Sequence, residues 1–358
     1  MTPRQICFLQ TDRAKKTLAQ ISLTQQTHIQ VASSLRRDFS IEEVNALLET
    51  VRLRQKGGRK FSKAADMLFE HDALQQASGE EIALYRAGRF KSASIRTIAD
   101  LCCSLGGDSL AFARVGQVWG VDRDFARLML AQHNTAVYGL HHTFTPIQAD
   151  LLELPPLPVQ GLFFDPARRT ADGKRIFSTA DYHPPLSVID RWREVVPSAA
   201  VKISPGVRYE ELPPEAEAEF ISVDGEVKEC VLWYGRLHSG VARRATLLPS
   251  QETITTEDLP DGRPDICLPR TYLYEPDGAA IRAHLVLAVA DLLGAQQIDA
   301  DIAYLTSDRL VSTPFATPFA VQDYFPFQLK RLKRYLSDRK IGRLEIKKRG
   351  SPIDVDLL

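Results

Sequence analysis

The chain has 358 residues, of which 44% are hydrophobic and 25% are charged, as in an ordinary globular protein. This length predicts two or three domains, each able to bury a core. Lysine plus arginine and aspartate plus glutamate both number 45, so a uniformly basic nucleic-acid-binding protein is excluded, and any such role must come from local patches.

The cysteine pattern and the amino terminus predict a cytoplasmic protein without a membrane span. Arg4, Asp12 and Arg13 interrupt the start of the chain, so no signal peptide is expected. The longest apolar stretch, residues 281–293, is too short and too polar to cross a bilayer. No cysteine pair or Cys/His cluster has zinc spacing, so no metal site is expected and a reducing compartment is indicated. The five cysteines are Cys7, Cys102, Cys103, Cys230 and Cys267.

The first 88 residues are predicted to be helical. Ser40-Ile-Glu-Glu43 has the pattern of a capping box, in which the first and fourth residues satisfy each other's backbone amides. Apolar residues at helical spacing follow it, and Gly57-Gly58 is expected to end this helix.

Strands and helices are predicted to alternate from residue 98 onward. Strands are expected at 98–102, 118–121, 147–150, 161–165 and 199–203, with helices at 109–115, 125–136 and 186–196. Such alternation indicates a parallel sheet with crossover helices. Residues 220–223, 229–234 and 244–248 follow with little room for helices, which favours an antiparallel edge.

The last third of the chain is expected to be a linker followed by a smaller α+β domain. Residues 251–269 are polar and rich in Pro, Gly and Asp, which indicates a linker. Strands are expected at 271–274, 302–306 and 343–346. One helix is expected across residues 281–292, with Gly294 as its C-cap, and another at 327–336.

Acidic residues at the ends of predicted strands indicate a nucleoside cofactor. Asp100-Leu-Cys-Cys-Ser-Leu-Gly-Gly-Asp108 forms a strand-turn-helix segment in which a ligand can approach the backbone. Methyltransferases that use S-adenosylmethionine (SAM) usually carry three spaced glycines here. In this chain Cys102 and Ser104 replace the first two, and Gly106 remains, followed by Gly107. The alternative is a tight turn of any α/β protein.

Two further acids complete the predicted cofactor site. Asp122 follows Asp100 by 22 residues, a distance that suits the ribose hydroxyls. The alternative for Asp122 is the N-cap of the helix that starts at Phe125. Asp150 ends the third predicted strand, where adenine is contacted in such folds, and its alternative is a loop aspartate.

Asp165-Pro166-Ala167-Arg168 is the candidate acceptor site. In amine-methylating enzymes of this fold, a carboxylate or amide and a carbonyl next to proline accept hydrogen bonds from the target amine. An aromatic ring then stacks on the base. Arg168 takes the place of that ring here, and it can stack on a base or bind phosphate. Tyr182 can supply the missing ring, while the alternative for Arg168 is a solvated loop residue.

Covalent methylation of a pyrimidine carbon is not expected. That chemistry needs a nucleophilic cysteine near the fourth or fifth strand, and no cysteine lies between Cys103 and Cys230.

Basic residues are concentrated near the carboxyl terminus, where they can follow a phosphate backbone. The alternative is an amphipathic helix with a solvated cationic face. A smaller basic cluster at residues 52–60 has the same two interpretations. The residues proposed to bind RNA are Lys330, Arg331, Lys333, Arg334, Lys347, Lys348 and Arg349.

Together these segments resemble a bacterial family of class I SAM-dependent methyltransferases with a C-terminal THUMP-like domain. The resemblance covers most of the chain. It rests on Lys60-Phe61, Ala73–Ala77, Arg86–Phe90, Asp100–Asp108, Asp165–Arg169, Tyr182–Ser187, Lys202–Gly206, Tyr274–Gly278, Ala303–Asp308 and Gly342–Gly350. It implies an α/β fold with a Rossmann-like, mostly parallel sheet and an antiparallel edge, a helical amino-terminal domain and a C-terminal α+β THUMP-like domain. RNA is implied as a substrate only by analogy with true THUMP domains.

The resulting prediction is a methyltransferase that acts on structured RNA, with tRNA as the first candidate. Its expected domains are residues 1–88 (helical), 89–250 (SAM-binding), 251–267 (linker) and 268–358 (THUMP-like). Asp100 and Gly106 are expected near the methionyl and ribose portions of SAM, and Asp165 and Pro166 are expected to orient the acceptor. Two alternatives stay open: a methyltransferase of a small molecule or protein, and a nonenzymatic RNA-binding protein with a degenerate SAM site.

Overall fold

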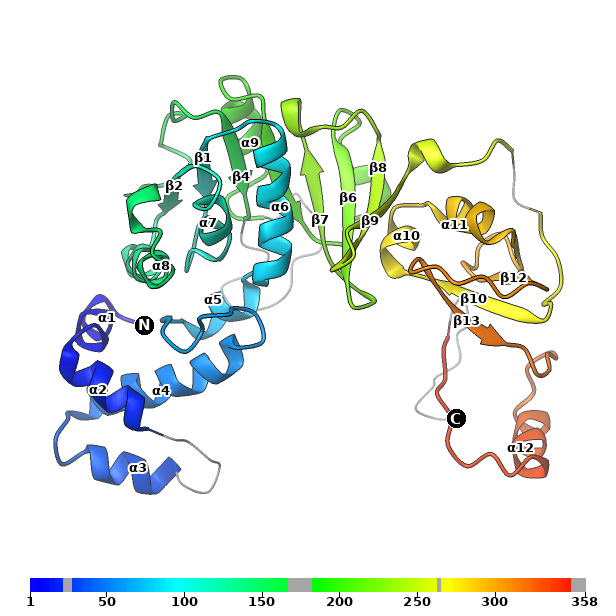
Figure 1. Cartoon of the computed structure of the whole chain (residues 1–358), viewed down its shortest axis with the longest axis horizontal. Helices are drawn as coiled ribbons and strands as arrows, with labels where there is room; N and C mark the ends of the chain where they lie inside the picture. The colour runs from blue at the N-terminus through cyan, green and yellow to red at the C-terminus, as the bar shows by residue number, and fades with distance from the viewer. Residues whose placement is uncertain (22–27, 167–181, 263–264, 349–358) are drawn as a thin grey trace. The chain divides into compact units, whose positions relative to one another are not determined.

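A computed structural model describes residues 1–21, 28–166, 182–262 and 265–348. The chain divides into two units, one formed by residues 1–218 and 229–240, the other by residues 219–228 and 241–358 (Figure 1). Strands β6 (Glu217–Val223) and β7 (Glu226–Trp233) each contribute residues to both units. The domain boundaries drawn from the sequence stay predictions.

The amino-terminal part of the first unit is helical, as predicted. The predicted capping box is present, since Ser40 N donates to Glu43 Oε2 at 2.8 Å and Glu43 N donates to Ser40 Oγ at 3.3 Å. The helix that follows ends at Gly57, also as predicted. The helices are α1 (Pro3–Leu9), α2 (Asp12–Gln20), α3 (His28–Leu35), α4 (Ile41–Gly57), α5 (His71–Gln76) and α6 (Glu80–Ser92).

The sheet of the first unit has the strand order β3-β2-β1-β4-β5-β7. Its first five strands are parallel, and β7 is antiparallel to β5, so the predicted mostly parallel sheet with an antiparallel edge is confirmed. The elements are β1 (Thr97–Leu101), α7 (Gly107–Phe112), β2 (Gln117–Asp122), α8 (Phe125–Val137), β3 (Phe144–Gln148), β4 (Gly161–Phe164), α9 (Ser187–Arg193) and β5 (Ala199–Ile203).

The amino-terminal helices share a hydrophobic core with the helices that follow β1 and β2. Leu47 of α4 and Phe61 are buried in one cluster with Leu105, Leu110 of α7 and Leu130 of α8. Burial of this apolar surface stabilises the helices against the sheet, so they are an integral part of the first unit.

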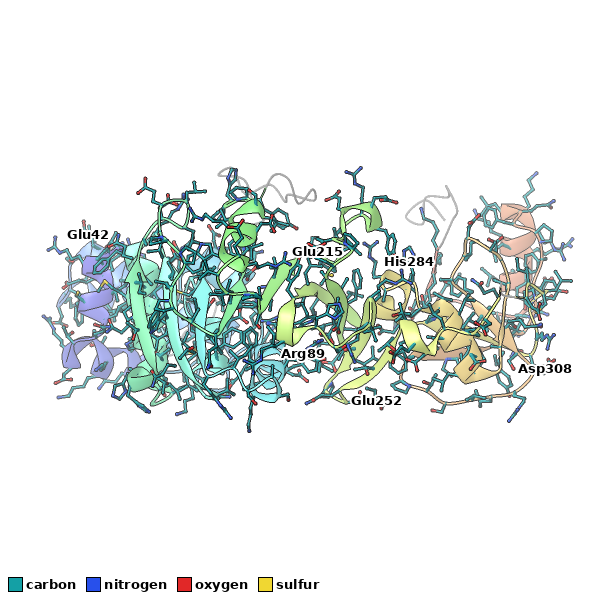
Figure 2. All side chains as sticks on the ribbon, turned by 90° about the horizontal axis from the view of Figure 1, so that it is seen from above. Glu42, Arg89, Glu215, Glu252, His284 and Asp308 are labelled. Atoms are coloured by element: carbon teal, nitrogen blue, oxygen red, sulfur yellow. The ribbon has the colours of Figure 1, made fainter. Side chains whose placement is uncertain are left out.

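Helix α6 is joined to the antiparallel strands by Arg89, which is labelled in Figure 2. Arg89 donates two hydrogen bonds to Glu217 of β6, at 2.9 and 2.8 Å. Its guanidinium also lies 4.2 Å from the ring centroid of Trp233 on β7. A charge-assisted pair beside an aromatic ring fixes the helix on this side of the sheet.

The second unit contains strands in the order β6-β8-β9, of which β8 and β9 are antiparallel, and a separate antiparallel sheet of order β11-β12-β10-β13. Helices accompany this smaller sheet, so the predicted C-terminal α+β domain is confirmed. The elements are β8 (Arg243–Leu248), β9 (Glu252–Thr255), β10 (Tyr272–Pro276), α10 (Gly278–Arg282), α11 (Val286–Leu293), β11 (Gln296–Gln297), β12 (Leu305–Ser307), β13 (Ala316–Ala320) and α12 (Leu329–Asp338).

Three predictions for this unit were wrong in detail. The predicted linker contains β9, which pairs with β8 in a hairpin. The single helix predicted over 281–292 is two helices, because His284 adopts a left-handed φ of 55° between them. Residues 343–346 form no strand, since they are exposed and have no partner strand among the described residues. The predicted C-cap Gly294 is confirmed, with a φ of 56°.

Candidate active site

Three acidic residues lie at the carboxyl ends of three adjacent strands. Asp100 is the fourth residue of β1, Asp122 ends β2, and Asp165 directly follows β4. Because β1 pairs with both β2 and β4 in parallel, the three residues lie at the same edge of the sheet. Open α/β sheets bind their ligands at this edge. The predicted positions at strand ends are confirmed, whereas the roles of these residues stay predictions.

The turn after β1 uses backbone conformations that favour glycine. The φ angle is 67° at Cys102, 51° at Ser104 and 83° at Gly106. A Cβ at Gly106 would lie 3.0 Å from Ala131 of α8, so both the left-handed conformation and the close packing favour glycine there. Helix α7 begins at the next residue, Gly107. Cys102 and Ser104 are left-handed without being glycine, which concentrates backbone strain at the predicted cofactor loop.

Asp122 is a buried carboxylate that holds this turn in place. Its Oδ2 accepts the backbone N–H of Ser104 at 3.0 Å, and its Oδ1 accepts that of Asp124 at 2.9 Å. Burial raises the pKa of Asp122. The N-cap of α8 is Asp124, whose side chain accepts the N–H of Ala126 at 2.8 Å, so the alternative assignment of Asp122 as that cap was wrong.

Asp150 lies two residues beyond β3 and is exposed. Its Oδ1 accepts the N–H of Leu152 at 2.9 Å, which closes a local turn. The preceding residue, Ala149, donates its N–H to the carbonyl of Asp122 at 3.2 Å. Asp150 therefore follows a segment that is hydrogen-bonded to the end of β2.

A buried ionic cluster lies behind the strand ends. Arg86 of α6 is fully buried and pairs with Asp108 of α7 and Glu229 of β7. Asp100 accepts a hydrogen bond from Ser109 Oγ at 2.5 Å. Burial and the negative charge of Asp108 raise the pKa of Asp100 to about 8.

Asp165 is more exposed than the acids of the buried cluster, Asp108 and Glu229, with 22% of its side chain accessible. Lys202, on β5, places its Nζ 2.6 Å from Asp165 Oδ2 and 3.0 Å from Ser78 Oγ. Asp165, Lys202 and Ser78 thus link the end of β4, strand β5 and the segment between α5 and α6.

The other predicted acceptor residues are placed differently. Pro166 is buried beside Asp165. Tyr182 is only 1% exposed, and its hydroxyl accepts the N–H of Ser204 at 3.0 Å. Its predicted stacking on a base stays a prediction and requires the ring to become accessible. Arg168 lies outside the described residues.

Lys202, Ser78, Arg86 and Glu229 were not predicted as site residues. The only sequence signal for Lys202 is one charged residue in the otherwise apolar strand Ala199–Ile203. Lysine is rarely buried without a partner, so this position indicates a buried acid opposite it. The pairing of Arg86 with Glu229 crosses 143 residues and depends on the strand order.

The two basic clusters differ in how their cations are used. In the amino-terminal cluster, Lys60 Nζ donates to the carbonyls of Leu74, Gln75 and Ala77, and Arg54 donates to those of Asp66 and Met67. In the carboxyl-terminal segment, Lys347 pairs with Glu275, while the cations of α12 lie on exposed positions. Arg349 lies outside the described residues.

Within the described ranges, no three or more His, Cys, Asp or Glu side chains form a group able to hold a metal ion. In the same part of the chain, no helix has the length and apolar character needed to cross a membrane.

Two family models match parts of the chain. The model described as RNA cap guanine-N2 methyltransferase matches residues 95–186, which contain β1 to β4. The model described as THUMP domain-like matches residues 316–358, which contain β13 and α12.

Curated relatives match most of the chain. Two sequences from Mycobacterium tuberculosis, strains CDC 1551 and H37Rv, are each 37% identical over 329 residues, covering 87% of this chain and 87% of the relative. Both are named uncharacterised S-adenosylmethionine-dependent methyltransferases. A crystal structure of a protein from Porphyromonas gingivalis W83, assigned as a methyltransferase, has a TM-score of 0.68 at 20% identity. It covers 89% of this chain and 87% of that one, which is a likeness of fold.

Proposed function

The chain belongs to a family of bacterial SAM-dependent methyltransferases with a C-terminal THUMP-like domain, and on this premise we propose that it methylates a base of structured RNA. tRNA is the first acceptor to test. The proposal includes a cytoplasmic location and the domain boundaries given above.

SAM is the cofactor of this enzyme. The residues at the strand ends fit it in two respects. Each oxygen of Asp122 accepts one backbone N–H and retains a second lone pair, so the carboxylate can also accept the two ribose hydroxyls. The carboxylates of Asp108, Asp165 and Glu229 outnumber the cations Arg86 and Lys202, which favours a ligand that carries positive charge. The raised pKa of Asp100 means that it adds a fourth negative charge only when it is ionised.

We assign the methionyl and ribose portions of SAM to Asp100 and the turn Cys102–Gly107, the ribose hydroxyls to Asp122, and the adenine to the segment at Asp150. When bound, SAM supplies an activated methyl group. The chain's own residues then need to orient the acceptor and exclude water, and little acid-base assistance is required.

The proposal rests on the position of Asp165. Its carboxylate is partly exposed and lies at the same edge of the sheet as Asp100 and Asp122. Asp165 and Pro166 are proposed to orient the acceptor base, and Arg168 is proposed to hold the base or a phosphate. The match of residues 95–186 to a model named for guanine-N2 methylation of RNA caps supports a base as acceptor. The exposed cations of α12 and the THUMP-like match support RNA.

The proposal is tested by methyl transfer from tritiated SAM to total RNA isolated from a strain that lacks this gene. We expect incorporation into an RNA fraction, with tRNA first, and loss of incorporation in the Asp165→Ala variant while its SAM affinity stays nearly unchanged. Titration calorimetry with SAM provides the second measurement.

Two results contradict the proposal in different ways. Incorporation into protein or small molecules, with none into RNA, would replace the acceptor class. An equal loss of SAM affinity in Asp165→Ala would move Asp165 from the acceptor to the cofactor.

A further inference from the structure

A buried lysine stands directly behind the acceptor carboxylate. Lys202 is 3% exposed, and its ammonium contacts Asp165 Oδ2 at 2.6 Å and Ser78 Oγ at 3.0 Å. A buried ammonium is retained only when its hydrogen bonds are satisfied. Ser78 is itself buried and lies just before α6. The amino-terminal region thus fixes the lysine, and the lysine in turn fixes the carboxylate.

This arrangement gives the two oxygens of Asp165 different roles. Oδ2 is engaged by the ammonium, whereas Oδ1 accepts no hydrogen bond from the described residues. The side chain is partly accessible, so Oδ1 is available to a ligand at the strand end. A carboxylate whose charge is balanced by a lysine is a good hydrogen-bond acceptor and a poor general base.

We propose that Lys202, held by Ser78, is a positioning residue that orients Asp165 so that Oδ1 accepts an N–H of a neutral amino group on the acceptor base. The inference rests on the proposed function and narrows its substrate class to exocyclic amines of RNA bases. A hydroxyl acceptor has to lose its proton as it attacks, which requires a general base. An amine attacks with its own lone pair.

The lone pair of the amino nitrogen forms the N–C bond to the methyl group, the C–S bond of SAM breaks, and its electron pair stays on sulfur. The nitrogen becomes cationic and releases one proton to solvent water, while Asp165 Oδ1 continues to accept the N–H that it orients. Lys202 keeps its proton throughout and holds the carboxylate at the orientation that receives the N–H.

The test compares three variants with tritiated SAM and total RNA from the gene-deletion strain. We expect Lys202→Met to lower kcat about 100-fold, because positioning of the acceptor is lost, with KM for SAM changed less than about threefold. Lys202→Arg should retain part of the rate, since a guanidinium can still pair with the carboxylate. Ser78→Ala should lower kcat by less than Lys202→Met, because Asp165 keeps its partner.

A double variant separates positioning from mere folding. In Lys202→Met the carboxylate of Asp165 is left without a counter-charge. Replacing Asp165 by Asn in the same protein removes that charge and keeps a side-chain oxygen that can accept an N–H. Lys202→Met with Asp165→Asn should therefore be about tenfold faster than Lys202→Met alone, as one uncompensated charge is removed. A double variant that is no faster than Lys202→Met would overturn the positioning role.

Product analysis tests the substrate class and keeps the two proposals distinguishable. Digestion of the methylated RNA and mass spectrometry of the nucleosides should place the methyl group on an exocyclic amino nitrogen. A methyl group on a ribose oxygen or a ring carbon would overturn this inference while leaving RNA methylation intact. A wild-type enzyme that transfers nothing to RNA would overturn the proposed function, and this inference with it.

Discussion

At the residue scale, two neighbouring aspartates stabilise different parts of the backbone near the proposed cofactor site. Asp122 accepts backbone N–H groups from Ser104 and Asp124, while the Asp124 side chain caps α8. Asp122 therefore contacts the turn that follows β1, whereas Asp124 contacts the start of α8. A matched pair of alanine variants separates the two.

We expect Asp122→Ala to abolish SAM binding at ligand concentrations that saturate the wild type, because the variant loses both the proposed ribose contact and the anchor of the turn. Asp124→Ala should lower the free energy of unfolding by about 1 kcal/mol through loss of the N-cap and leave SAM affinity within about threefold. Calorimetric titration and chemical denaturation measure these effects. Equal SAM affinities in the two variants would remove Asp122 from the cofactor site.

Asp100 makes the stability of the ligand-free protein depend on pH. Burial and Asp108 raise its pKa to about 8 from the ordinary value of 3.8, so between these values the folded chain binds a proton that the unfolded chain has released. The free energy of unfolding therefore falls as pH rises through this window.

Asp100→Asn removes this contribution and keeps an oxygen for Ser109. From pH 6 to pH 8, wild type should lose roughly 1 to 3 kcal/mol more stability than the variant. Denaturant unfolding at both pH values measures the difference. Parallel curves for the two proteins would show that Asp100 is already ionised at pH 6.

The strand-end acids could be predicted from sequence because their positions follow from local strand patterns. Only the strand bounds and the rule that parallel strands end at one edge were needed to predict the positions of Asp100, Asp122 and Asp165. Lys202 could not be assigned in the same way, since its partner is 37 residues away and its pairing depends on β4 lying beside β5. The same reason explains why Arg86 was missed.

At the scale of single elements, the short helix α5 is completed by a cation from another segment. Lys60 Nζ donates to the carbonyls of Leu74 at 2.8 Å, Gln75 at 3.1 Å and Ala77 at 2.7 Å. These are carbonyls of the last turn and the C-cap, which no later turn of helix satisfies. The cation also interacts favourably with the helix dipole.

Lys60→Met should therefore lower the free energy of unfolding by about 1 to 2 kcal/mol, because two partly buried carbonyls and one exposed carbonyl lose their donor. Lys56→Met, an exposed position on α4, serves as the control and should change it by less than about 0.5 kcal/mol. RNA affinity should be the same in both. A larger loss of RNA affinity in Lys60→Met than in the control, with stability unchanged, would support the nucleic-acid interpretation of this cluster.

Element boundaries were predicted well where a local signal ends them and poorly where pairing decides. The Ser40 capping box and Gly57 gave the bounds of α4, and Gly294 gave the end of α11. The strand β9 was missed although Thr253, Ile254 and Thr255 are β-branched, because it has only four residues and lies in a polar segment, so its pairing with β8 identifies it. Residues 343–346 have strand-like composition and lack a partner strand in the described chain, so they remain irregular.

At the scale of the whole molecule, the two units supply different parts of the proposed function. The first unit contains those residues proposed to bind the cofactor or the acceptor that the structure describes, and the amino-terminal helices belong to its core. The second unit contains the carboxyl-terminal cations, which lie on α12 and the segment after it (Figure 1). The chain is neutral as a whole, so RNA binding requires these charges to act as a local patch.

The salt dependence of RNA binding tests whether α12 provides that patch. Replacement of Lys330, Lys333 and Arg334 by Gln removes three exposed cations. We expect weaker binding of total RNA. We also expect a shallower slope when the logarithm of the binding constant is plotted against the logarithm of the salt concentration. The slope should decrease by up to about 0.7 to 0.9 for each RNA phosphate that the variant no longer neutralises. SAM affinity should be unchanged, because the residues proposed to bind the cofactor lie in the other unit.

The matched control replaces Lys15, Lys16 and Arg36, which are three exposed cations of the first unit, by Gln. It changes net charge by the same amount, so any effect of overall charge on RNA binding appears equally in both variants. A reduced slope in the α12 variant alone would locate the phosphate contacts on the second unit. Equal reductions of the slope in both variants would show that RNA binding depends only on the net charge of the protein. An unchanged slope in both variants would exclude α12 as the RNA-binding element.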